Sequence, residues 1–201
     1  MPPRPGSWGE RLRRVAADER VARHAGFWWG LAEGVAFFIV PDVYISAAAL
    51  FSYRVGAVAW AASIAGSLVA VTIIRLLTLR PEVSYLAWLD AVPGISAGMI
   101  ERVSAAVEAA GLPWTPLLVL GGVPLKLYAA AAFASGWSLT PVLLWTVLAR
   151  VARIAPTFLL AAAVRRLLGR RIDAYPGAWL VALALFWLVF YAFYFQRMGG
   201  D

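Results

Sequence analysis

The chain of 201 residues contains no cysteine, no asparagine and a single histidine, His24. Without cysteine there are no disulfide bonds, zinc–thiolate sites, iron–sulfur sites or thiol catalysis, and one histidine excludes a histidine-rich metal centre. Charged residues are also scarce, at 14% against about a quarter in ordinary soluble domains, whereas 62% of the residues are hydrophobic. The composition therefore excludes a soluble globular protein, and we expect no metal and no cofactor.

Long hydrophobic runs are abundant. Residues 55–74, 127–149 and 174–196 carry no charged side chain, and each reaches the length of about 20 residues that a helix needs to cross the bilayer core. Three such runs predict an all-α integral membrane protein. The 18 basic residues outnumber the 11 acidic ones, which fits cytoplasmic loops beside anionic lipids, and we expect no binding to nucleic acid.

The N-terminal segment, residues 1–25, is basic and has the pattern of an amphipathic helix on the membrane surface. Ser7 and Glu10 have the spacing of a capping box, and Leu12 and Val15 recur at helical intervals between arginines. The alternative is a solvated basic tail. No apolar signal-peptide core follows before residue 26, so we expect the segment to stay on the mature protein, with the N-terminus in the cytoplasm.

Residues 26–201 are interpreted as one membrane domain, whose first segment, residues 26–52, contains Glu33, Pro41 and Asp42. Proline removes a backbone donor, so we expect limbs of about 15 and 11 residues, each too short to cross a core of about 30 Å. This pattern favours a re-entrant helical hairpin with Pro41 at its tip and Asp42 at the positive end of the returning limb. A straight spanning helix is the alternative.

The later segments extend this scheme. We expect spanning helices at residues 55–78, 138–168 and 174–196, a surface helix within residues 80–111, and a second re-entrant hairpin at residues 112–136, whose tip holds Gly121, Gly122 and Pro124. Superposing Pro41 on Pro124 aligns two alanine runs, which predicts that the second half of the chain repeats the first hairpin. Interrupted hydrophobic segments at matching positions of two halves indicate a transporter binding site near the midplane.

Arginine distribution predicts the orientation. Residues 165–171 hold four arginines and no acid, whereas residues 80–111 hold two arginines and four acids. A basic excess marks the cytoplasmic side, so we place residues 165–171 inside and residues 80–111 outside. Tyr191 and Tyr194 in the last helix suit an interfacial aromatic belt.

Five ionisable residues fall inside these membrane segments: Glu33, Asp42, Lys126, Arg150 and Arg153. Each charge at the bilayer centre costs at least about 2.5–3.5 kcal/mol, so their presence needs a reason. Ion pairs that only fix helix packing are one interpretation. Two acids and three bases leave one positive charge, however, which an anionic ligand would balance.

We predict that Arg150 and Arg153, which share a helix face, bind a lipid phosphate together with Lys126, because the guanidinium fork suits phosphate oxygens. Lys126 would stand in the first turn of a helix, where the macrodipole disfavours a cation, so we expect an acidic side chain or a bound anion beside it. Glu33 and Asp42, removed from water, would switch between protonated and charged forms and couple transport to protons.

The chain resembles the DedA family, also called SNARE-associated or VTT-domain membrane proteins, and particularly its YqaA-like branch. The resemblance spans about residues 26–168 and rests on three stretches in the family's order, Ala32-Glu33 with Phe38-Ile39-Val40-Pro41-Asp42-Val43, Val123-Pro124-Leu125-Lys126-Leu127-Tyr128-Ala129-Ala130 and Leu148-Ala149-Arg150-Val151-Ala152-Arg153-Ile154. It implies two opposed re-entrant hairpins and the movement of phospholipids or polyprenyl-phosphate carriers between leaflets. It also implies functional roles for the acids Glu33 and Asp42 and for the arginines Arg150 and Arg153.

The leading hypothesis is therefore a flippase or scramblase for a phosphate-bearing lipid. A proton- or ion-coupled small-solute transporter and a non-transporting scaffold are the alternatives. We expect no enzyme, because no Ser/His/Asp or similar catalytic group is present. The expected partners are membrane lipids with an anionic headgroup, a homo-oligomer is left open, and the location in a bacterium would be the cytoplasmic membrane.

Overall fold

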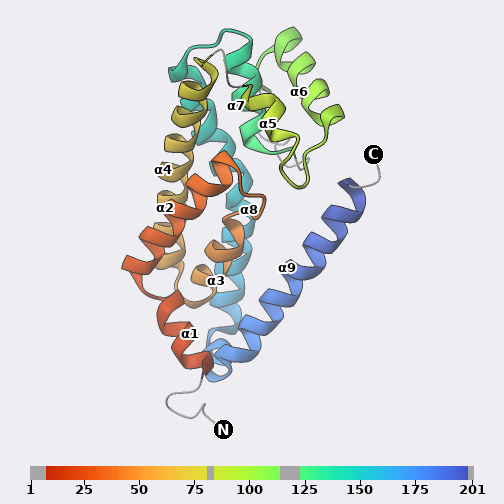
Figure 1. The fold of residues 1–201 in the computed structure, drawn as a ribbon. Helices are drawn as coiled ribbons and strands as arrows, with labels where there is room; N and C mark the ends of the chain where they lie inside the picture. The colour runs from red at the N-terminus through yellow and green to blue at the C-terminus, as the bar shows by residue number, and fades with distance from the viewer. Residues whose placement is uncertain (1–7, 81–83, 114–122, 199–201) are drawn as a thin grey trace.

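The computed structural model describes residues 8–80, 84–113 and 123–198, and within these ranges the chain is helical and contains no strand. The helices are α1 (Trp8–Ala16), α2 (Glu19–Val35), α3 (Asp42–Phe51), α4 (Tyr53–Thr78), α5 (Tyr85–Leu89), α6 (Ala97–Ala110), α7 (Leu125–Ala134), α8 (Leu139–Ala174) and α9 (Pro176–Met198). Figure 1 shows α4 and α8 running along an elongated bundle, with α1 at one end and α5 and α6 at the other. The predicted all-α class is confirmed for the described residues.

Three helices in the described ranges, α4, α8 and α9, are long and apolar enough to cross a membrane. The chain is therefore a membrane-embedded protein, and the three predicted spans are present as helices. The α8 helix is kinked at Leu168, where its backbone angles are non-helical, and it continues from there to Ala174. The predicted end of this span at residue 168 coincides with the kink. Arg165 and Arg13 both pair with Asp173, at 2.8 and 2.9 Å, and hold these last turns.

The basic N-terminal segment contains α1 and the first turns of α2. The predicted helix is present as α1, whose Trp8, Leu12 and Val15 are exposed; Ser7 of the capping box lies outside the described residues, and the place of α1 on the membrane surface stays a prediction. The next helix, α2, already begins at Glu19, because the Asp18 side chain accepts hydrogen bonds from the first backbone N–H groups and caps it.

Small residues bring α2 and α4 into close contact. A side-chain carbon added at Gly26 would meet the backbone carbonyl of Ala59, and one at Gly30 would meet that of Ser63. Such close approach of backbones at four-residue intervals is typical of helix pairs in membranes. The α2–α4 pair therefore forms a tightly packed frame for the residues that follow.

The predicted interruption of the first hydrophobic segment is confirmed. The helix α2 ends at Val35, and α3 begins at Asp42 with Pro41 as its N-cap. The limbs have 17 and 10 residues rather than the expected 15 and 11. The first limb is longer because α2 begins at Glu19, and the second is shorter because the interruption covers residues 36–41. The first limb leads away from the α1 end of the bundle and α3 returns toward it (Figure 1). Whether this hairpin is re-entrant in a bilayer stays a prediction.

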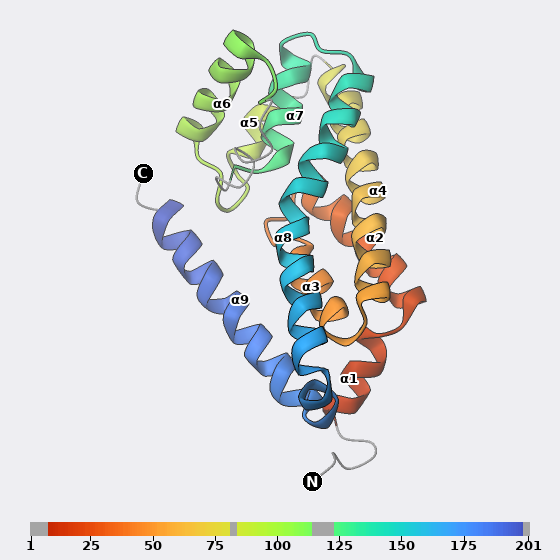
Figure 2. The same cartoon turned by 180° about the vertical axis from the view of Figure 1, so that it is seen from behind.

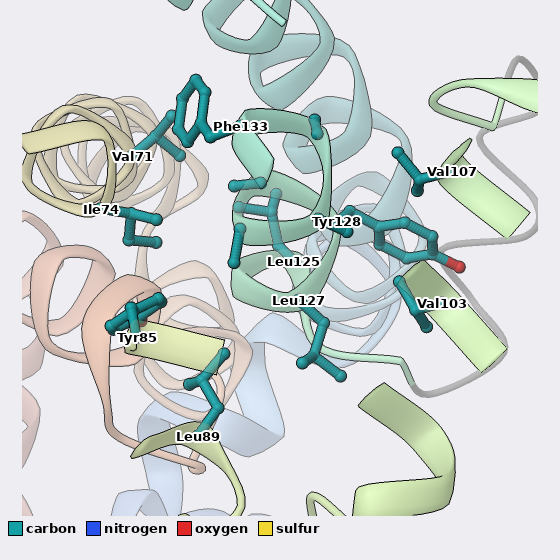
Figure 3. Close-up of a cluster of buried hydrophobic side chains, with 14 of the residues drawn as sticks. Val71, Ile74, Tyr85, Leu89, Val103, Val107, Leu125, Leu127, Tyr128 and Phe133 are labelled. Carbon is teal, nitrogen blue, oxygen red and sulfur yellow. The ribbon is translucent and has the colours of Figure 1, made fainter. Parts of the chain in front are cut away.

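The second ten-residue helix, α7, begins after Pro124 as α3 begins after Pro41. Its side chains from Leu125 to Phe133 are all buried. Figure 3 shows how α7 is surrounded by Val71 and Ile74 of α4, Tyr85 and Leu89 of α5, and Val103 and Val107 of α6. The predicted helix within residues 80–111 is thus present as α6, and its apolar side packs on α7.

The first limb of the second predicted hairpin falls on residues 114–122, and Gly121 and Gly122 of its tip lie with it outside the described residues. The second hairpin and the inverted repeat therefore stay predictions.

Candidate functional site

The break between α2 and α3 leaves backbone polar groups without helix partners in an apolar part of the chain. Side chains from four helices satisfy them: Tyr85 donates to the Val35 carbonyl, Lys126 to that of Phe37 and Trp29 to that of Ile39, while Tyr191 accepts from the Val40 N–H. Burial raises the pKa of the Tyr85 hydroxyl, which keeps it a neutral donor. Irregular backbone at membrane depth persists only where protein or a cavity covers it in this way.

Lys126, the single lysine of the chain, is anchored at this break. Its side chain is 2% exposed, and its Nζ donates to the carbonyls of Glu33 and Phe37, each at 2.8 Å. The Glu33 carbonyl belongs to the last turn of α2, where the helix dipole is negative, and the Phe37 carbonyl lies in the break that follows. The acidic side chain or anion expected as the direct partner of Lys126 is therefore replaced by main-chain oxygens, which only the tertiary arrangement supplies.

Arg150 on α8 pairs with Glu33 in the last turn of α2. Its Nη2 contacts the Glu33 carboxylate, and the two side chains are 1% and 7% exposed. The guanidinium supplies the counter-charge that a buried carboxylate needs. The Arg150 Nε is buried as well and has no hydrogen-bond partner among the described residues, so one donor of this buried cation is left over.

A second pair forms one turn further along α8. The Arg153 Nη1 lies 3.4 Å from the Asp42 Oδ2, and the arginine side chain is 23% exposed. Asp42 stands in the first turn of α3, as predicted, where the dipole favours an anion. Arg153 is therefore the more accessible of the two arginines.

All five predicted charges line one cavity of about 640 Å³, within the range of roughly 300–1,000 Å³ of small-ligand sites. The structure places Lys126, Arg150 and Arg153 around this one cavity, and their joint binding of a phosphate stays a prediction. The rest of the wall is mainly apolar. Part of it comes from residues 37–40, 92–95 and 123–125, and the larger part comes from α3, α8 and α9, including Leu50, Leu160, Val164, Trp179, Leu183, Phe186 and Phe190. The cavity thus combines a charged end with a hydrocarbon-like wall.

Two residues of α9 were not recognised as part of the site from the sequence. Trp187 donates from its Nε1 to the Ser46 hydroxyl at 3.1 Å, and Tyr191 accepts from the Val40 N–H at 2.7 Å. Tyr191 and Tyr194, expected in an interfacial belt, both line the cavity. Six of the eight aromatic residues of α9 line the cavity. The aromatic side of this helix was therefore a signal in the sequence that could have indicated the cavity face.

No group of histidine and acidic side chains in the described part of the chain could hold a metal ion. Comparisons of the chain with protein-family models, with curated proteins and with solved structures find no match. The resemblance to the DedA family therefore stays a prediction, and the chemistry of the cavity is the basis for a functional proposal.

Proposed function

We propose that this protein is a flippase or scramblase that moves a phosphate-bearing lipid, a phospholipid or a polyprenyl phosphate, between the leaflets of its membrane. One observation carries the proposal: a single cavity joins a buried cluster of five charges to a long apolar wall. An amphiphile with an anionic head and hydrocarbon tails matches both parts. A small polar solute would match only the charged end.

The charges support an anionic headgroup. Two acids and three bases leave one positive charge in the cavity. Arg153 is partly exposed, the Arg150 Nε has no acceptor among the described residues, and two carbonyls occupy two of the three N–H donors of Lys126. A phosphate bound at Arg153, with Arg150 and Lys126 as further contacts, would supply the missing acceptors and the missing charge.

The two ion pairs offer a route to proton coupling. Phosphate oxygens and the Asp42 carboxylate would compete for the guanidinium of Arg153. A carboxylate that loses its counter-charge in a water-poor cavity is costly, and uptake of a proton restores neutrality. In this proposal Asp42, and Glu33 beside Arg150, take up a proton when the lipid binds and release it when the lipid leaves.

The architecture proposed around this site is that of two opposed re-entrant hairpins, in agreement with the DedA resemblance. The limbs α2 and α3, of 17 and 10 residues, measure about 26 and 15 Å, and both are shorter than a core of about 30 Å. The N-terminus and residues 165–171 would then be cytoplasmic, with α5 and α6 on the opposite side.

This orientation is testable because the chain contains no cysteine. Ser84, before α5, and Ala109, in α6, are both exposed, and each can be replaced by a single cysteine. An impermeant thiol reagent added to intact cells should label both, and should label a control cysteine at Arg170 only after the membrane is opened. Protection of both Ser84 and Ala109 positions would contradict the re-entrant arrangement.

Transport itself is tested in liposomes that contain the purified protein and a fluorescent phospholipid or polyprenyl phosphate in one leaflet. Arg153→Lys keeps the charge but removes the planar donor fork, so we expect lipid movement to fall at least tenfold, with unchanged thermal stability. Arg170→Lys, at an exposed position outside the cavity, is the matched control. Wild-type protein that moves no lipid, or Arg153→Lys protein that moves it at the wild-type rate, would contradict the proposal.

A further inference from the structure

The cavity extends well beyond its charges. Eight residues of α9 line it, at intervals of three and four that form one helix face: Trp179, Ala182, Leu183, Phe186, Trp187, Phe190, Tyr191 and Tyr194. From Trp179 to Tyr194 this face is about 22 Å long. One leaflet contributes about 15 Å of hydrocarbon, half of a core of about 30 Å. A phosphate alone would leave most of this face unused.

The two ends of the cavity differ in polarity. At the Tyr191 end lie the break between α2 and α3 and the charge cluster, because Tyr191 binds the Val40 N–H next to Asp42. At the Trp179 end lies an apolar cluster in which Trp179 packs with Leu50 and Val164. A ligand that fills the cavity is therefore polar near Tyr191 and apolar toward Trp179.

The cavity is also open toward the surrounding membrane. Leu160, Phe186 and Phe190 line it and are still 63%, 54% and 42% exposed. Seen from behind in Figure 2, α9 starts against the body and then diverges from α8. Between these helices a molecule dissolved in the bilayer can reach the cavity from the side.

The charge of the cavity decides which kind of apolar occupant fits. An apolar helix packed along this face would leave the net positive charge at the other end of the cavity unbalanced. One lipid molecule supplies both parts, because its phosphate carries the counter-charge and its hydrocarbon chain lies along the face.

We infer that this apolar part of the cavity binds one hydrocarbon chain of a membrane lipid, which enters between α8 and α9 and lies along α9 from Tyr191 toward Trp179, with its phosphate at Arg153. The inference rests on the proposed function for the phosphate end and adds the chain as a recognised part of the ligand. It also makes the α9 face the element that determines which chain lengths bind.

Binding to the purified full-length protein in amphipol tests the inference with hexadecyl phosphate and butyl phosphate as probes. Both carry the phosphate and differ only in the chain, so hexadecyl phosphate should bind at least tenfold more tightly. Ala182→Trp places a large ring into the cavity and should remove this difference. Ala184→Trp, two residues away on the same helix and exposed but outside the cavity lining, should keep it.

A second measurement needs no bulky variant. Hexadecyl phosphate with a photoreactive diazirine at the end of its chain is bound to the wild-type protein, and the labelled residues are mapped by mass spectrometry. Labels near Trp179 and Leu183 that excess hexadecyl phosphate removes would support the inference. Labels confined to outward residues such as Leu188 would overturn it.

The outcomes separate the chain site from transport. If Ala182→Trp binds hexadecyl phosphate as the wild type does, while Arg153→Lys abolishes lipid movement in liposomes, the chain site is wrong and the proposed function stands. If the chain-length preference and the labels are found but no lipid moves, the protein holds a lipid without transporting it, and the proposed function is wrong.

Discussion

The helix pair α2–α4 and the helix α9 are attached to the protein in opposite ways. In the most apolar 18-residue stretch of α4, 44% of the residues are buried inside the protein, whereas in that of α9 only 6% are buried. Glycine, alanine and serine line the α2–α4 contact, whereas Trp, Phe and Tyr line the cavity side of α9. Small side chains let backbones touch, and large aromatic ones hold a helix at a distance.

This difference assigns separate tasks to the two regions. The α2–α4 pair positions Glu33 and the break at residues 36–41, to which Lys126 and Tyr85 bind. The α9 helix contributes the open wall of the cavity and is joined to the break through Tyr191. A tightly packed side that holds the charges and a little-buried side that forms the open wall fit the proposed site for a lipid.

The largest effect is expected where the tightly packed side meets α8, at the pair of Glu33 and Arg150. Arg150→Met strands a buried carboxylate and should lower the free energy of unfolding by about 3–5 kcal/mol. Replacing both partners, in Glu33→Leu/Arg150→Met, removes the stranded charge and should restore most of the stability. Thermal and denaturant unfolding of the purified proteins measures both.

Lipid movement separates the structural from the functional interpretation of this pair. The restored double variant should remain inactive if the pair takes part in transport, and should be active if it only fixes helix packing. A single Arg150→Met protein as stable as the wild type would show that the pair is not shielded from water.

The parts that the sequence predicted well depend on local patterns. The spans α4 and α9 follow from uncharged apolar length, and the break before Asp42 follows from Pro41. The five charged site residues were found because each is costly in a membrane segment. These signals are contained in a single stretch of chain and do not need the fold.

The parts that were wrong or missed depend on contacts between distant segments. Lys126 binds carbonyls about 90 residues earlier in the chain, and main-chain oxygens carry no sequence signature. Tyr191 reaches Val40 across 151 positions. The spacing of Gly26, Gly30 and Gly34 was a readable signal for the α2–α4 contact.

The second largest effect on stability is expected at the contact between α2 and α4. In Gly30→Ala the added methyl group meets the Ser63 backbone, which cannot yield as a flexible side chain would, so the unfolding free energy should fall by about 1–3 kcal/mol. Gly98→Ala, in α6, meets only the end of Arg102 at 3.5 Å and should be neutral or stabilising by up to about 1 kcal/mol. Equal unfolding temperatures for both variants would show that α2 and α4 are not tightly packed.

The smallest effect on stability is expected on the little-buried side, at Tyr191. Tyr191→Phe keeps the ring and removes the acceptor of the Val40 N–H, a loss of about 1–3 kcal/mol if that donor stays buried and unpaired. Because α9 is little buried in the protein, the break can instead open locally, so we expect the global unfolding temperature to change little. Hydrogen exchange of the amides at residues 36–41 should rise at least tenfold, since local opening exposes them without unfolding the bundle. Tyr175→Phe, at an exposed residue before α9, should leave this exchange unchanged. Unaltered exchange in Tyr191→Phe would mean that α9 does not hold the break, and the two sides of the site would then be mechanically independent.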